Sequence, residues 1–95
     1  MNQGLEQYYS GDENWQDFVK IAEQNTCLPD DYKMKIVQAL KGHYDIAIVV
    51  YYRLLDESFE WIYKKNPALE NLTPIECLET PDLIERLKEA LMRMP

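Results

Sequence analysis

The stretch HYDIAIVVYYRLLDESFEWIYKK, residues 43–65, decides the fold because it holds the longest apolar run of the chain, from Ile46 to Tyr52. Taken alone, this β-branched run fits a buried strand. A helix is favoured because apolar residues continue at helical spacing, without a glycine or proline, as far as Lys65. A helix that is apolar all round needs cover on more than one side. We therefore expect a central helix, with room for a bend near residues 56–58, or a helix in a subunit interface.

A first helix is expected well before this segment. It should begin within SGDE, residues 10–13, where Ser10 or Asp12 is the candidate N-cap. Its predicted buried face is Trp15, Phe18, Val19 and Ala22. It should end near residues 25–27, because Pro29 disfavours helical backbone at the residue before it.

A second helix should open at Pro29, where Asp30 and Asp31 complement the positive end of the helix dipole. Its predicted buried face is Tyr32, Ile36, Val37 and Leu40. Gly42 should end it as the residue that follows the C-cap, a position that favours glycine. His43, the single histidine, then marks the boundary of the next helix.

Prolines punctuate the C-terminal third of the chain. Asn66-Pro67 should stop the central helix and begin a tight connection. Thr73 should cap a short helix, with Pro74 at its first position and Glu76 completing a T-x-x-E capping box. A second Thr-Pro pair at residues 80–81 repeats this device before the last helix.

The last helix is amphipathic. Its predicted apolar face is Leu83, Ile84, Leu87, Leu91 and Met94. The side chains expected to face water are Glu85, Arg86, Lys88, Glu89 and Arg93. The chain is thus predicted to form one all-α domain, residues 1–95. We expect a small bundle of about five helices, with a long central apolar helix and a C-terminal hairpin of a short helix and a helix.

The composition and net charge of the chain limit the kinds of partner that it can be expected to bind. The chain is 46% hydrophobic and 28% charged, which is typical of a globular protein, and its net charge is −7. Such a charge disfavours binding to phosphate backbones and suits a basic protein partner. Cys27 and Cys77 have no redox or metal-site spacing, so we expect reduced cytoplasmic thiols that pack as small hydrophobes. No targeting peptide or membrane span is expected, because no apolar run is long enough.

No catalytic or metal-binding constellation is apparent. A nucleophilic triad would depend on His43, and nothing in the sequence singles out its nucleophile. A zinc site needs more histidines or cysteines in a recognisable spacing. Adjacent carboxylates such as Asp30 and Asp31 diverge by about 100° on a helix, which is poor geometry for acid–base catalysis. We therefore expect a protein that is not an enzyme and that uses no cofactor or metal.

The segment WIYKKNPALENLTPIECLETPDLIERLKEALMRM, residues 61–94, resembles the C-terminal toxin-binding domain of Xre/MbcA/ParS-type antitoxins. That family carries the pattern W-(L/I)-x-x-x-N-P-A-L-x-x-x-(T/S)-P-(L/I)-E-x-L. The residues that match it are Trp61, Ile62, Asn66, Pro67, Ala68, Leu69, Thr73, Pro74, Ile75, Glu76 and Leu78. The apolar segment before them suits the helix that precedes this domain in the family.

The resemblance implies a mostly helical bacterial antitoxin. Such a protein binds a RES-type toxin, which is similar to ADP-ribosyltransferases and consumes NAD, and occludes its active site. The residues implied in partner binding are Trp61, Asn66, Pro67, Ala68, Leu69, Thr73, Pro74 and Glu76. Residues 43–95 would hold the central helix and the toxin-binding region.

The first part of the chain, residues 1–42, departs from the family, whose members carry a longer helix-turn-helix that binds DNA. Here it would be an acidic helical part that replaces or abbreviates that domain. Residues 1–30 hold six acids and one base, a net charge of −5, so DNA binding is not expected.

The sequence leaves several alternatives open. Residues 66–69 also fit an ordinary helix stop, and residues 73–76 an ordinary capping box. A homodimer is expected through the apolar central helix, at Ile46, Val49, Val50, Tyr52 and Leu55. The alternative function is an acidic decoy, encoded by a phage or plasmid, that binds a nucleic-acid-binding protein by mimicking phosphates. A small transcription regulator that uses residues 29–55 is a third possibility.

Overall fold

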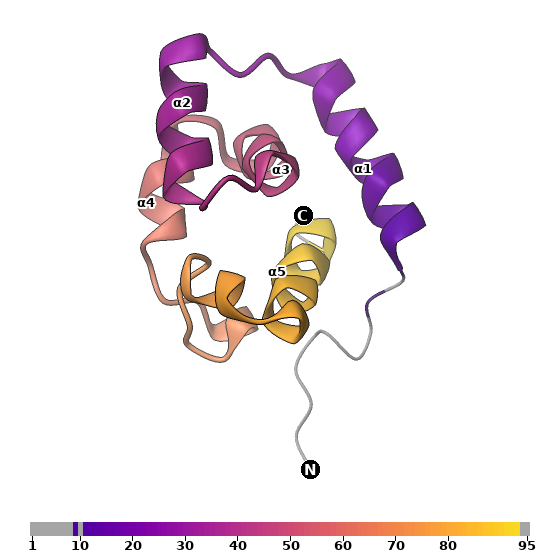
Figure 1. The fold of residues 1–95 in the computed structure, drawn as a ribbon, viewed down its shortest axis with the longest axis vertical. Coiled ribbons are helices and arrows are strands. Elements are labelled where there is room, and N and C mark those ends of the chain that lie inside the picture. Colours follow the sequence, from indigo (N-terminus) through magenta and orange to yellow (C-terminus); the bar gives the residue numbers. More distant parts are fainter. Residues whose placement is uncertain (1–8, 10, 94–95) are drawn as a thin grey trace.

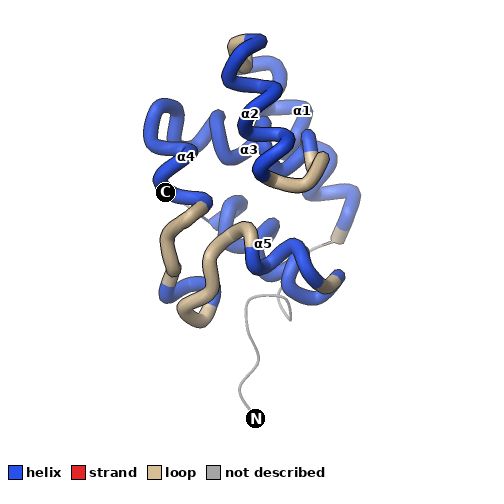
Figure 2. The backbone as a smooth tube through the Cα atoms, turned by 60° about the vertical axis from the view of Figure 1, so that its left-hand side comes forward, coloured by secondary structure: helices blue, strands red, loops and turns tan. Residues whose placement is uncertain are grey.

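A computed structural model of the chain describes residue 9 and residues 11–93. The elements in this range are α1 (Asp12–Asn25), α2 (Asp30–Ala39), α3 (Tyr44–Leu54), η2 (Leu55–Glu57), α4 (Ser58–Ile62), η3 (Pro67–Leu69), η4 (Glu76–Glu79) and α5 (Pro81–Arg93), where η marks a 3₁₀ helix. Across the described residues the fold is all-α, as predicted, and strand-like pairing is limited to an isolated bridge between Asn66 and Leu72 (Figure 2).

Helix α3 is the centre of the core (Figure 1). All five side chains of the run Ile46–Val50 are buried, which confirms a helix with cover on more than one side. The cover comes from the same chain, since α1, α2, α4 and α5 all contact α3. The indole of Trp15 on α1 is fully buried and donates a hydrogen bond of 2.9 Å to Asp45 at the start of α3.

The central helix is shorter than predicted. It breaks at Leu55, where φ is 50° and ψ is −120°, and α4 then ends at Ile62 instead of continuing to Lys65. Tertiary packing outweighs the helical pattern here, because the break lets the ring of Phe59 meet Tyr32 on α2, with ring centroids 4.8 Å apart. The hydroxyl of Ser58, 2.7 Å from the carbonyl oxygen of Leu55, donates a hydrogen bond to it.

Helix α1 matches its predicted limits and buries Trp15, Val19 and Ala22. Its predicted cap does not hold for Asp12, which is the first helical residue. Gly11 occupies the N-cap position, with φ of 106°, and makes no side-chain hydrogen bond. A side chain is not needed there, because glycine adopts this positive φ without strain. The other candidate cap, Ser10, lies outside the described residues.

Helix α2 ends in a Schellman motif that differs from the prediction by one residue. Lys41, with φ of 57°, directly follows the C-cap Leu40, and Gly42, with φ of 89°, comes one residue later. The amide of Gly42 donates to the carbonyl of Val37 at 2.8 Å, and the amide of Lys41 to that of Gln38 at 3.0 Å. The predicted face is confirmed in part: Ile36 and Leu40 are buried, whereas Tyr32 and Val37 are half-buried.

Helix α5 buries more polar surface than predicted. Leu87 and Leu91 are fully buried as expected, but Arg86 and Glu89, predicted to face water, are only 9% and 6% exposed. Arg86 meets the connection before α5 at Glu70, and that connection contacts α5 through η3 and η4, whereas Glu89 pairs with Arg93 one turn along the same helix. The remaining member of the predicted apolar face, Met94, lies outside the described residues.

Arg53 joins three helices at the end of α5. Its Nε and Nη2 atoms donate hydrogen bonds to the carbonyl oxygens of Leu91 at 3.2 Å and Met92 at 3.3 Å. Its guanidinium also lies over the ring of Phe18 on α1, 4.7 Å from the centroid. The last turn of α5 is thereby fastened to α1 and α3. Of the helices described, none combines the length and apolarity needed to cross a bilayer.

Candidate partner-binding surfaces

The connection between α4 and α5 begins with a closed ring, residues 66–72. The backbone of Asn66 binds across it, since its amide donates to the carbonyl of Leu72 at 3.0 Å and its carbonyl accepts from the amides of Leu69 and Asn71, both at 2.9 Å. The Asn66 side chain accepts a further bond from the amide of Ala68 at 2.9 Å. This is the predicted helix-stop chemistry, and it holds the ring in one conformation.

The ring is fastened to the body of the protein at two points. Leu69 is fully buried in the core. Glu70, in the left-handed conformation with φ of 56°, lies 3.3 Å from the guanidinium of Arg86 on α5. Pro67 and Ala68, which precede these anchors and form the tip of the ring, are exposed. Sequence reasoning missed the ion pair because Arg86 has the spacing of an ordinary solvated helix residue.

The predicted capping box follows the ring. The amide of Thr73 donates to Glu76 Oε1 at 2.8 Å, and the amide of Glu76 donates to Thr73 Oγ1 at 3.1 Å. These bonds hold the pKa of the Glu76 carboxyl below its usual value, chiefly through the backbone amide of Thr73. Thr80 repeats the device, accepting from the amide of Leu83 at 3.2 Å. The box opens a 3₁₀ turn, η4, in place of the predicted short α-helix.

Most of the residues that the resemblance implies in partner binding are buried or half-buried in the structure. Leu69 and Pro74 are buried. Trp61, Asn66 and Thr73 are half-buried. Those with exposed surface for a partner are Pro67, Ala68 and Glu76.

The five residues expected at a homodimer interface are separated by the fold. Ile46, Val49 and Val50 are fully buried inside the single chain, so they offer no surface to a second copy. Tyr52 is half-buried, and Leu55 is 53% exposed. The need for cover that motivated the dimer is therefore met within one chain, and self-association stays a prediction.

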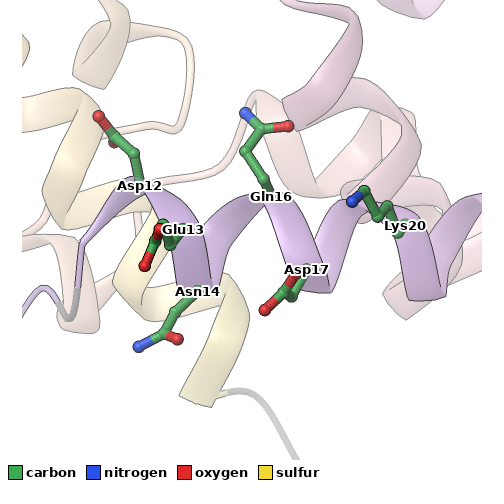
Figure 3. Close-up of a pocket in the computed structure, with 6 residues that line it drawn as sticks. All are labelled: Asp12, Glu13, Asn14, Gln16, Asp17 and Lys20. Carbon is green, nitrogen blue, oxygen red and sulfur yellow. The ribbon is translucent and has the colours of Figure 1, made fainter.

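The outer side of α1 is an acidic surface, whose lining residues are Asp12, Glu13, Asn14, Gln16, Asp17 and Lys20. Figure 3 shows that all of these side chains project from α1 itself. All six are exposed. This surface belongs to the acidic N-terminal part on which the decoy alternative depends.

A third surface, on α2, was not predicted. One hollow there is lined by Asp30, Lys33, Met34, Val37, Gln38 and Tyr44. A neighbouring hollow is lined by Lys35, Gln38, Ala39, Phe59 and Tyr63. Met34 is 75% exposed and Tyr63 is 61% exposed. The sequence feature that could have predicted this surface is Met34, an apolar residue that stands between two lysines and outside the predicted buried face.

The remaining candidates for chemistry are dispersed. In residues 9 and 11–93, no group of three His, Cys, Asp or Glu side chains is placed to hold a metal ion. His43 directly precedes α3, at the predicted boundary. Both cysteines are free thiols; Cys77 is buried as predicted, whereas Cys27 is exposed, so its predicted packing is wrong. The short connection around Pro29 leaves Cys27 at the surface between α1 and α2.

Comparison of the chain with known protein families, with curated proteins and with solved structures found no match.

Proposed function

We propose that this chain is an antitoxin-like protein that binds a RES-type toxin and occludes its active site, without catalysis of its own. The observation that carries the proposal is the ring at residues 66–72, which is closed by backbone hydrogen bonds and exposes Pro67 and Ala68 at its tip. The same residues carry the sequence resemblance to the toxin-binding domain of Xre/MbcA/ParS-type antitoxins.

A rigid tip favours binding because little conformational entropy is lost when the partner docks. The ring meets this requirement through Leu69, buried in the core, and Glu70, paired with Arg86. On this proposal Leu69 and Pro74 act indirectly, by shaping the ring and the turn after it. The contact itself would be made by Pro67, Ala68 and Glu76.

The test is co-expression with a RES-domain toxin, followed by co-purification of the pair and by growth rescue. We expect the wild-type chain to form a stable complex and to restore growth. Ala68→Arg places a long charged side chain on the ring tip and should abolish both effects while the helical circular dichroism spectrum is retained. Gln24→Arg, on the exposed side of α1, is the matched control and should bind normally. Equal binding by both variants would exclude the ring as the contact.

The decoy alternative has one observation in its favour, the exposed carboxylates of α1. Asp12, Glu13 and Asp17 lie on one open surface and could stand in for successive phosphates (Figure 3). A decoy held by charge should lose its partner between about 0.15 and 1 M salt, because the screening length falls from about 8 to 3 Å. A complex made by the packed ring should survive that change.

A further inference from the structure

The surface on α2 is rich in lysine beyond the first turn of the helix, where Asp30 and Asp31 lie. Residues 32–44 carry three lysines and no acid, although the chain as a whole has a net charge of −7. All three lysines are exposed, and none of them forms an ion pair with a described residue. Lys33 instead lies over the ring of Tyr44, 5.2 Å from its centroid. Beyond that first turn of α2, the surface therefore presents three lysines that pair with no described acid. Glu23 and Asp30 border it on the side of Lys33 and Tyr44.

The same surface is apolar between its lysines. Met34, Val37 and Tyr44 line one hollow, which borders a second one at Gln38. The far wall of the second hollow is made by Phe59 and Tyr63 of the α4 region. Exposed apolar surface beside unpaired charge is typical of a protein–protein contact, and methionine adapts well to such surfaces.

The first hollow extends along one side of α2. Its lining residues on α2 lie at positions 30, 33, 34, 37 and 38, which form one continuous stripe of the helix surface. That stripe runs for about 12 Å at 1.5 Å per residue, close to two helical turns. A partner helix laid along α2 could therefore set apolar side chains spaced i, i+4 and i+7 into it.

We propose that α2, together with Tyr44 and Tyr63, is a docking surface for an acidic amphipathic helix of a partner protein. Leucine-like side chains of that helix pack on Met34 and Tyr44, and its carboxylates face the lysines. Asp30 and Asp31 in the first turn of α2 set the orientation of the partner helix, because they repel its carboxylates. The acid-rich end of the partner therefore lies toward Lys41.

This surface is separate from the ring proposed to bind a toxin. In both views α2 lies in the upper part of the molecule and the connection to α5 in the lower part (Figures 1 and 2). The inference therefore does not depend on the proposed function. A variant of the α2 surface should leave toxin binding intact, and Ala68→Arg should leave the α2 surface intact.

The probe is a synthetic helical peptide with leucines at i, i+4 and i+7 and glutamates at the flanking positions. It is titrated into the isotope-labelled full chain at about 0.15 M salt, where weak long-range attraction is screened. We expect amide shifts confined to residues 30–44 and to Tyr63. Lys33→Glu/Lys35→Glu should raise the dissociation constant about tenfold or more, as expected for lost and reversed charge pairs. Met34→Ser should raise it several-fold.

The matched control is Lys64→Glu/Lys65→Glu, which makes the same change in net charge outside the hollows and should bind the peptide as the wild type does. A peptide with its leucines scrambled should bind at least several-fold more weakly. No binding by the probe, shifts beyond residues 30–44 and Tyr63, or equal binding of the scrambled peptide would overturn the proposal. So would tighter, lysine-dependent binding of a single-stranded oligonucleotide, or lysine-dependent self-association, in which case the occupant is nucleic acid or a second copy.

Discussion

Replacement of Glu89 by leucine should stabilise the protein. Glu89 is 6% exposed, and its Oε1 atom is buried without a hydrogen-bond partner among the described residues. Its other carboxylate oxygen pairs with Arg93, whose side chain is 53% exposed and so keeps its hydration when the partner is removed. Glu89→Leu therefore removes a buried orphan acceptor and leaves behind a charge that water can still solvate.

The magnitude follows from three contributions. An unsatisfied buried acceptor destabilises by about 1–3 kcal/mol, and more for a charged group. Loss of an i, i+4 ion pair costs about 0.2–0.5 kcal/mol. Burial of a leucine side chain contributes a further gain of up to about 1.5–3 kcal/mol where the site accommodates it. We expect a net stabilisation of about 2 kcal/mol, to which the removal of the unsatisfied buried acceptor contributes most.

Arg86→Leu is the matched comparison, because Arg86 lies on the same helix and is 9% exposed. It pairs with Glu70, so its replacement removes one of the two anchors of the ring and should destabilise by about 1.5–3 kcal/mol, the range for a hydrogen bond to a charged group. Urea unfolding followed by circular dichroism measures both changes. With a slope near 1 kcal/mol per molar, Glu89→Leu should raise the midpoint by about 2 M and Arg86→Leu should lower it. A Glu89→Leu protein less stable than the wild type would refute the orphan-acceptor argument.

Two further predictions concern the connection and the helix break. Thr73→Ala should lower stability by about 1 kcal/mol in urea unfolding at neutral pH, through loss of the cap. The folded pKa of Glu76 is lowered chiefly by the backbone amide of Thr73, which Thr73→Ala keeps, so this contribution to stability is present above the ordinary pKa of 4.5 and is lost in both proteins as pH falls through the folded value. The variant lacks only the smaller effect of the Thr73 side chain on that pKa, so the difference between wild type and variant should shrink slightly in acid and not in base. Leu55→Gly should raise the thermal midpoint, because glycine accepts the positive φ that costs leucine about 1–2 kcal/mol, whereas Leu55→Val should lower it. Equal midpoints for the glycine and valine variants would mean that Leu55 is not strained.

Local chemistry was largely readable from the sequence. The limits of α1, the capping box of Thr73 and Glu76, and the turn at Asn66 each depend on residues within four positions of one another, and the structure confirms them. The sequence left room for a bend near residues 56–58, and the structure interrupts the helix at Leu55. That the helix breaks there, and does not merely bend, was not readable, because the rings of Phe59 and Tyr32 that meet beyond the break are 27 positions apart. A periodic pattern shows which residues can share a helix face. It does not show whether packing against an aromatic ring distant in sequence ends the helix.

The exposed surfaces also differ in whether the sequence could predict them. The exposed tip at Pro67 and Ala68 follows from a motif, whereas the burial of Arg86 and Glu89 was missed because a helical wheel cannot show which other segments pack on the polar side of α5. The hollow on α2 was missed because it takes walls from Tyr44 and Tyr63, on two other segments.

The position of Arg53 has a consequence for how the protein opens. Helix ends usually fray first, because their last carbonyls lack partners within the helix. In α5 two of these carbonyls accept from Arg53, whose guanidinium is stacked on Phe18. Unwinding the last turn therefore also exposes a cation and an aromatic ring at the α1–α3 junction. The end of α5 should behave as part of the same cooperative unit as the core, so that solvent reaches its amides through opening of the whole domain and not through a loose end.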